Sequence, residues 1–119
     1  MKYFIIIITL AISLAVGKVI EKNIIMIPDT NASEVNVWDT YVTKKDGGIM
    51  HFDIVAPVAI TDAEMIYNYG RSYLQTKGQS GQPLSAQQCR LCHIEKLRPE
   101  WEHEIAEKGF FIIEMEGCN

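Results

Sequence analysis

The residues with the clearest chemical potential are Cys89, Cys92 and His93, which form the pattern C-x-x-C-H. This pattern attaches c-type haem in proteins that carry it, because the two thiols form thioethers and the histidine ligates the iron. The same spacing serves zinc, which takes four protein ligands at structural sites. For zinc, His93 or His103 would be the third ligand and Cys118 a distant fourth. Zinc is favoured over haem, because the sequence predicts no long helices to enclose a haem.

Two further interpretations of the same pattern stay open. A thioredoxin-like redox pair would need Cys89 at the N-terminus of a helix that follows a strand, yet residues 79–84 look like a loop. Two partly buried thiols that bind nothing are the simplest interpretation. Local structure separates these options. If residues 89–95 form a strand, positions three apart face opposite sides and both sulfurs cannot easily reach one ion, whereas a turn would let them converge.

A second set of residues that could do chemistry is Asp39, His51 and Asp53. If the two segments pair so that odd-numbered positions share a face, these residues meet with Tyr41 as a polar patch. The even-numbered positions then supply the core: Trp38, Met50, Phe52 and Ile54. A histidine between carboxylates can act as a general base or a metal ligand, although a structural hydrogen bond or ion pair is the commoner role.

The elements that position these residues follow from composition and periodicity. Residues 34–42 and 49–55 are rich in β-branched and aromatic residues, and the Asp-Gly or the Gly-Gly pair of residues 46–48 between them predicts a tight antiparallel hairpin. Helical spacing predicts a helix from Ala63 to Leu74, and a second one follows Pro99. Residues 89–95 are ambiguous, and residues 110–115 are strongly strand-like. We therefore expect a small α+β domain of order ββαβαβ, with a mostly antiparallel sheet and two helices on one face.

The N-terminal residues differ from the rest of the chain. Residues 4–16 are an unbroken apolar run, shorter than the roughly 20 residues of a membrane span and close in length to a secretory signal. We expect residues 1–33 to be a signal-like or anchor-like segment with a linker, and residues 34–119 to be one domain. A membrane contact would run through residues 1–27, if these are retained. The alternative is a mis-called start, with Met26 as the first residue. The protein would be exported or membrane-anchored if Met1 is the true start, and otherwise cytoplasmic.

Composition limits the partners. The chain has 119 residues, 11 basic and 15 acidic, and a formal net charge of −4. Nucleic acid is therefore an unsuitable partner, since phosphate contacts need a basic face. No phosphate-binding glycine loop and no complete catalytic constellation is visible. These features favour a non-enzymatic binding or interaction module with a Cys/His metal site. An exported thiol-redox protein or haem c electron-transfer protein is the alternative.

Several blocks of the sequence together resemble a small bacterial family known as domain of unknown function twenty-twenty-four. The blocks are residues 35–42, 50–53, 81–84, 89–95 and 111–115, together with Cys118. The resemblance extends over roughly residues 34–119. It implies a small single domain with a sheet and helices, which agrees with the expectation from the residues, and it implies no activity.

Overall fold

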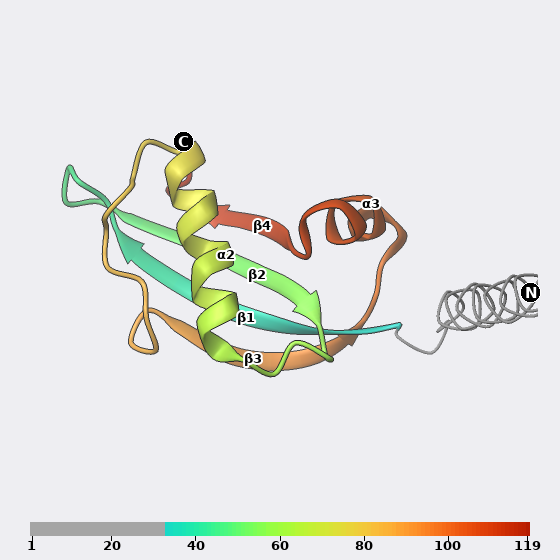
Figure 1. The fold of residues 1–119 in the computed structure, drawn as a ribbon. Coiled ribbons are helices and arrows are strands. Elements are labelled where there is room, and N and C mark those ends of the chain that lie inside the picture. Colours follow the sequence, from blue (N-terminus) through green and yellow to red (C-terminus); the bar gives the residue numbers. More distant parts are fainter. Residues whose placement is uncertain (1–32) are drawn as a thin grey trace, which may run out of the picture. The chain divides into compact units, whose positions relative to one another are not determined.

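The computed structural model of the protein describes residues 33–119. The predicted signal-like segment lies outside these residues, apart from Ser33. In the described part of the chain, four strands and two helices follow one another in the order β-β-α-β-α-β, as Figure 1 shows. Their bounds are β1 Glu34–Thr43, β2 Ile49–Pro57, α2 Ala63–Thr76, β3 Cys89–Lys96, α3 Pro99–Lys108 and β4 Phe111–Glu116. The predicted α+β class and element order are therefore confirmed.

The strands form one open sheet in the order β3-β1-β2-β4, and every neighbouring pair is antiparallel. The β1–β2 hairpin turns at Gly47, whose φ of 91° is a conformation that glycine adopts without strain. Its register pairs Trp38 with Ile54 and Asp39 with Asp53. Since side chains alternate along a strand, even-numbered positions of both strands face one side and odd-numbered positions face the other.

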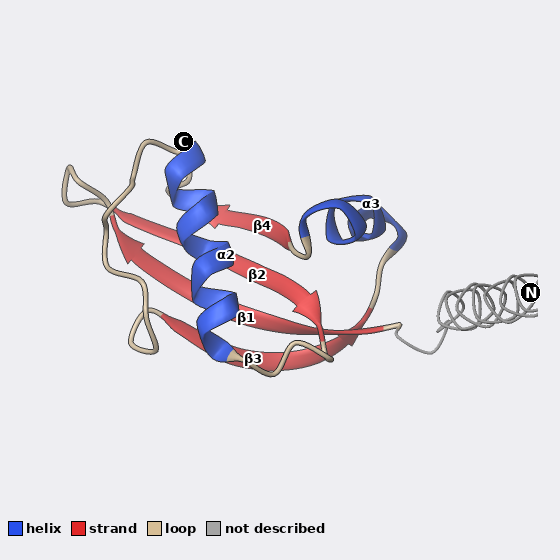
Figure 2. Ribbon diagram, in the orientation of Figure 1, coloured by secondary structure: helices blue, strands red, loops and turns tan. Residues whose placement is uncertain are grey.

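Helix α2 covers the even-numbered face. Its buried residues Ile66 and Leu74 join a core cluster with the buried strand residues Met50, Phe52 and Ile54. Figure 2 shows α2 lying across the strands. This is the core that the sequence predicts, built from the same even-numbered positions. Trp38 packs against this cluster and is partly buried.

Helix α3 packs on the opposite face, so the expectation of two helices on one face is wrong. Its buried residue Trp101 forms a separate cluster with Val35, Val37 and Val55, which lie at odd-numbered positions. The physical reason is that side chains alternate along each strand, so these three valines lie on the face that α2 does not cover. Their burial against Trp101 is favourable. In the described residues, no helix is long and apolar enough to cross a membrane.

The ambiguous residues 89–96 form strand β3, which has a bulge where the pairing with β1 shifts between Val37 and Trp38. His93 lies opposite Val37 and Leu91 lies opposite Trp38, so Cys92 is the extra residue of the bulge. C-x-x-C-H is thus part of an outer strand and not part of a helical turn. Pairing with β1 stabilises this conformation, for which the local sequence has no clear preference.

Phe52 tests the core beneath α2. Its ring is fully buried and lies 4.7 Å from the ring of Tyr73, measured between centroids. We expect Phe52→Ala to lower the free energy of unfolding by about 3–5 kcal/mol, because the truncation leaves a cavity between sheet and helix. Ile49→Ala, at an exposed position of the same strand, should change it by less than about 0.5 kcal/mol. Urea denaturation of both variants measures the difference, and equal effects would contradict this core assignment.

Candidate functional site

The structure brings Asp39, His51 and Asp53 together on the odd-numbered face of the sheet. Asp39 lies directly opposite Asp53, and the nitrogen Nε2 of His51 lies 2.6 Å from Oδ1 of Asp39 and 3.9 Å from Oδ1 of Asp53. One potential ligand atom from each side chain lies within 4.8 Å of the others. The side chains of His51 and Asp53 are 20% and 18% exposed, and that of Asp39 is 38% exposed, so the group is open to solvent on one side. We call these three residues the acid–imidazole patch.

Tyr41 orients the imidazole of the patch. It lies opposite His51 in the hairpin register, and the two rings stack with their centroids 4.0 Å apart and their planes 12° apart. A stacked ring restricts rotation of the histidine side chain, so Nε2 stays directed at the carboxylates. The sequence predicts this neighbour from the same alternation that predicts the patch.

The patch has a negative electrostatic environment. Burial, followed by the negative charge of Asp39 and a hydrogen bond with it, raises the pKa of the Asp53 carboxyl. Desolvation and then the charges of Asp39, Asp53 and Glu116 raise the pKa of the Tyr41 phenol. Two carboxylates placed directly opposite each other repel, which is unfavourable for the fold unless a positive charge lies between them. A cation between the two carboxylates would offset this repulsion.

Strand β3 adds the titratable side chains of His93 and Glu95 to the same face of the sheet. The register places His93 opposite Val37 and Glu95 opposite Val35, both at odd-numbered positions. His93 Nε2 lies 2.7 Å from Oε2 of Glu95, and Arg98 donates two hydrogen bonds to Oε1 of the same carboxylate. The hydrogen bond from His93 is the largest of several contributions that lower the pKa of Glu95. The charge of His93 also makes a small opposing contribution that lowers the pKa of Asp53, although that pKa remains raised overall.

The four predicted zinc ligands are not gathered in the structure. Cys89 is buried in the core cluster under α2, Cys92 is exposed at the bulge, and His93 pairs with Glu95. Cys118 is also buried, and its thiol lies 3.4 Å from the backbone oxygen of His51. Burial raises the pKa of the Cys89 thiol, which disfavours the thiolate that a metal would need. Within residues 33–119, the acid–imidazole patch is the group of three histidine, cysteine or acidic side chains whose ligand atoms lie close enough to share a metal ion.

Glu116 is a neighbour of the patch that the sequence does not predict. It lies opposite His51, because the β2–β4 pairing shifts between His51 and Phe52 and inserts one extra residue into β4. Regular alternation from Ile113 would have placed Met115 on this face instead. A bulge has no reliable signature in a single sequence, so only the pairing of β4 with β2 reveals this carboxylate.

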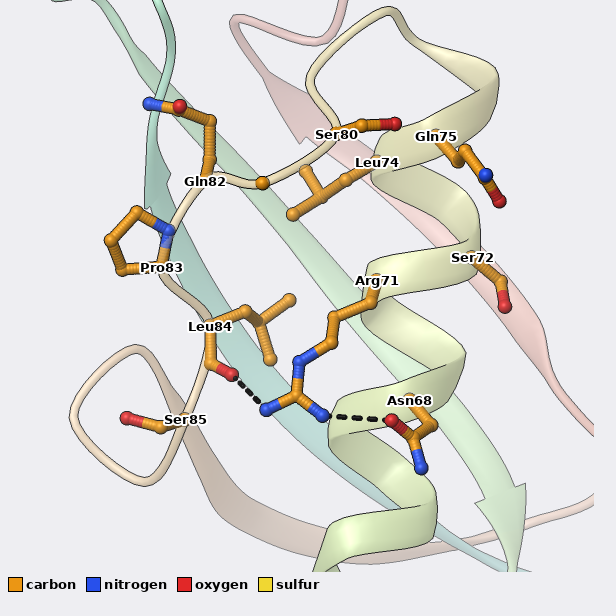
Figure 3. Close-up of a pocket in the computed structure, with 11 residues that line it drawn as sticks. Asn68, Arg71, Ser72, Leu74, Gln75, Ser80, Gln82, Pro83, Leu84 and Ser85 are labelled. Atoms are coloured by element: carbon orange, nitrogen blue, oxygen red, sulfur yellow. Dashed lines mark hydrogen bonds between the residues drawn. The ribbon is translucent and has the colours of Figure 1, made fainter.

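A groove between α2 and the loop of residues 80–85 has a structural role (Figure 3). The guanidinium of Arg71 donates to the backbone oxygen of Leu84 at 2.9 Å and to Oδ1 of Asn68 at 2.7 Å. A further hydrogen bond of 2.8 Å runs to Oε1 of Glu64. Arg71 thus fastens the loop to the helix, and its donors are directed at groups of the protein itself.

Comparisons with known proteins agree with this fold. A family model described as "Domain of unknown function (DUF2024)" matches residues 33–115. The NMR structure of protein NE1680 from Nitrosomonas europaea, a structural-genomics target, is 37% identical in sequence, and the two superpose with a TM-score of 0.63. The match covers 72% of this chain and 99% of that chain. No curated protein matches the sequence.

The raised pKa of Asp53 predicts how stability depends on pH. The folded state binds this proton more tightly than the unfolded state, so its contribution to stability is lost as the pH rises through the raised pKa. We expect Asp53→Asn to stabilise the protein in EDTA at pH 7 by about 0.5–1 kcal/mol, since it removes one of two negative charges that repel each other. The gain should vanish below the unfolded pKa of about 3.9.

Urea denaturation at several pH values measures this difference. Glu34→Gln is the control, because Glu34 is an exposed acid at the start of β1. A loss of stability at pH 7 in Asp53→Asn would contradict the repulsion between Asp39 and Asp53.

Proposed function

The chain belongs to the DUF2024 family of domains of unknown function, and we propose that it is a non-enzymatic binding module that holds a divalent metal ion at the acid–imidazole patch. The observation that carries this proposal is the proximity of one imidazole nitrogen and two carboxylates on two paired strands. A divalent cation would offset the repulsion between Asp39 and Asp53. It would also use His51, whose Nε2 is directed at both carboxylates.

The distances between ligand atoms are compatible with a small ion. Ligands bound tetrahedrally at about 2.0–2.1 Å lie about 3.3–3.4 Å from one another. The separations of Nε2 from the two carboxylate oxygens, 2.6 and 3.9 Å, lie on either side of this value. Small rotations of the two aspartate side chains would therefore make them equal.

The ligand types favour a borderline ion. Imidazole suits zinc, iron, copper and nickel, whereas carboxylates suit manganese, magnesium and calcium. One nitrogen and two oxygens thus favour zinc, or manganese and iron, over the soft Cu(I) ion. Three protein ligands would leave at least one position for water or a small anion, on the side where the patch is exposed.

The surroundings of His51 support binding rather than catalysis. In the described part of the chain, the side-chain partners of its imidazole are the carboxylates of Asp39 and Asp53 and not a serine, threonine or cysteine nucleophile. The thiol-redox and haem c alternatives have less support, because Cys89 is buried in the core and its raised pKa disfavours the thiolate.

Metal binding predicts stabilisation that depends on the patch. We expect Zn²⁺ at a concentration one hundred times its dissociation constant to raise the free energy of unfolding by about 2.7 kcal/mol, since it binds only the folded state. Asp39→Asn and His51→Gln should each weaken Zn²⁺ binding about a hundredfold or more. Isothermal titration calorimetry of the full chain, with Zn²⁺, Mn²⁺ and Mg²⁺ in parallel, measures the affinity of each ion.

Cys92→Ser is the matched control, because Cys92 is an exposed thiol outside the patch. Its Zn²⁺ affinity should equal that of the unaltered protein. If Cys92→Ser abolished binding while Asp39→Asn retained it, the Cys/His set would be the site and the proposal would be wrong.

A further inference from the structure

We propose that the outer edge of β3 pairs antiparallel with the same edge of a second copy of this chain, with Arg90 of each copy opposite Glu95 of the other. Strand β3 lies at one edge of the sheet, where β1 is its neighbour on one side. No strand among residues 33–119 pairs with its other side, whose backbone donors and acceptors are a template for an added strand. This interface is separate from the metal site and does not depend on it.

Exposed apolar side chains mark this edge. Leu91 and Ile94 of β3 are 52% and 59% exposed, among the highest values for large apolar residues in the described chain. Both lie on the α2 side of the sheet, because Leu91 pairs with Trp38 and Ile94 pairs with Asn36. An exposed edge with two such residues is more favourable when another apolar strand covers it.

The sequence of β3 is complementary to itself. When two copies of Cys89–Lys96 run antiparallel about a twofold axis between Cys92 and His93, Arg90 faces Glu95 and Leu91 faces Ile94. Each of these contacts then occurs twice, as an isologous interface requires. This self-complementary pattern favours a second copy of the chain as the partner, because the sequence of an unrelated strand is not constrained to match it.

The bulge makes this register possible. Residues that lie opposite each other in a sheet must point to the same face. Arg90 and Glu95 both lie on the face of the acid–imidazole patch, since they pair with Asp39 and Val35. In a regular strand, positions five apart would face opposite sides, and the extra residue at Cys92 corrects this.

The charges of the two sheet edges distinguish them. Arg90 takes part in no ion pair among residues 33–119, and it is exposed. Strand β4, at the other edge, carries Glu114 and Glu116 and no basic residue. Two copies of β4 would therefore bring like charges together, whereas two copies of β3 bring opposite charges together. Because the contact is a single strand from each copy, we expect a concentration-dependent dimer.

Charge complementation between two variants tests the interface. In Arg90→Glu every charged contact across the axis becomes acid against acid, and in Glu95→Arg it becomes base against base. We expect each variant alone to dimerise about tenfold or more weakly than the unaltered chain. An equimolar mixture of the two should form a heterodimer with an affinity within about fivefold of the original. Sedimentation equilibrium of the full chains over a range of concentrations measures these affinities.

Lys45→Glu, an exposed charge reversal in the β1–β2 turn, is the matched control and should dimerise normally. Circular dichroism checks that each variant is folded. If Glu95→Arg does not fold, Arg90→Glu alone remains decisive, because Arg90 takes part in no ion pair among the residues that the structure describes. An unaltered chain that is monomeric at all concentrations would overturn the proposal. A dimer whose affinity is the same in Arg90→Glu as in the unaltered chain would also overturn it, because the contacts would then run through another surface.

The thiol of Cys92 provides a second measurement. Cys92 is exposed, whereas Cys89 and Cys118 are buried, and the proposed axis passes beside it. A short bismaleimide, which adds to one thiol at each end, should join two copies of the unaltered chain. The yield should fall in Arg90→Glu, and Cys92→Ser should give no covalent dimer. Equal yields for the unaltered chain and Arg90→Glu would contradict the proposed register.

Discussion

The register of the β1–β2 hairpin is the constraint on which the other features of this domain depend. It pairs Trp38 with Ile54 and Asp39 with Asp53, so it decides at once which residues form the core and which form the polar patch. A shift of β2 by one residue would move Phe52 to the face away from α2 and would place Asp53 beneath the helix. Such a shift would expose apolar residues that α2 now buries, so their burial selects the observed register. The same register holds the carboxylates of Asp39 and Asp53 in unfavourable proximity.

Two bulges then modify the regular alternation at the outer strands. The bulge at Cys92 brings His93 to the patch side of the sheet, and the bulge in β4 brings Glu116 opposite His51. Each bulge adds a titratable side chain to one face without changing the central hairpin. The central strands thus provide the rigid part of the candidate site, and the irregular outer strands provide the groups that surround it.

The charged contacts of the proposed dimer lie on the same face of the sheet as the acid–imidazole patch, whereas its apolar contacts lie on the α2 side. Arg90 lies directly opposite Asp39, so the proposed dimer edge borders the acid–imidazole patch. The patch holds two like charges facing each other within one copy, whereas the proposed edge brings unlike charges together between copies. In the described part of the chain Arg90 takes part in no ion pair, so it can meet Glu95 of a second copy while the patch stays open to solvent.

The sequence by itself determined the strands of the hairpin and the presence of a turn between them, and it placed Asp39, His51 and Asp53 at alternate positions, because a period of two is a local property of the chain. The observed register of β1 against β2 then decided that these three residues meet. Only the tertiary structure decided the conformation of C-x-x-C-H and the face that α3 covers. The spacing of Cys89 and Cys92 is compatible with a turn or a strand, and pairing with β1 selects the strand. Likewise Trp101 could pack on either face, and the three valines left uncovered by α2 select the opposite one.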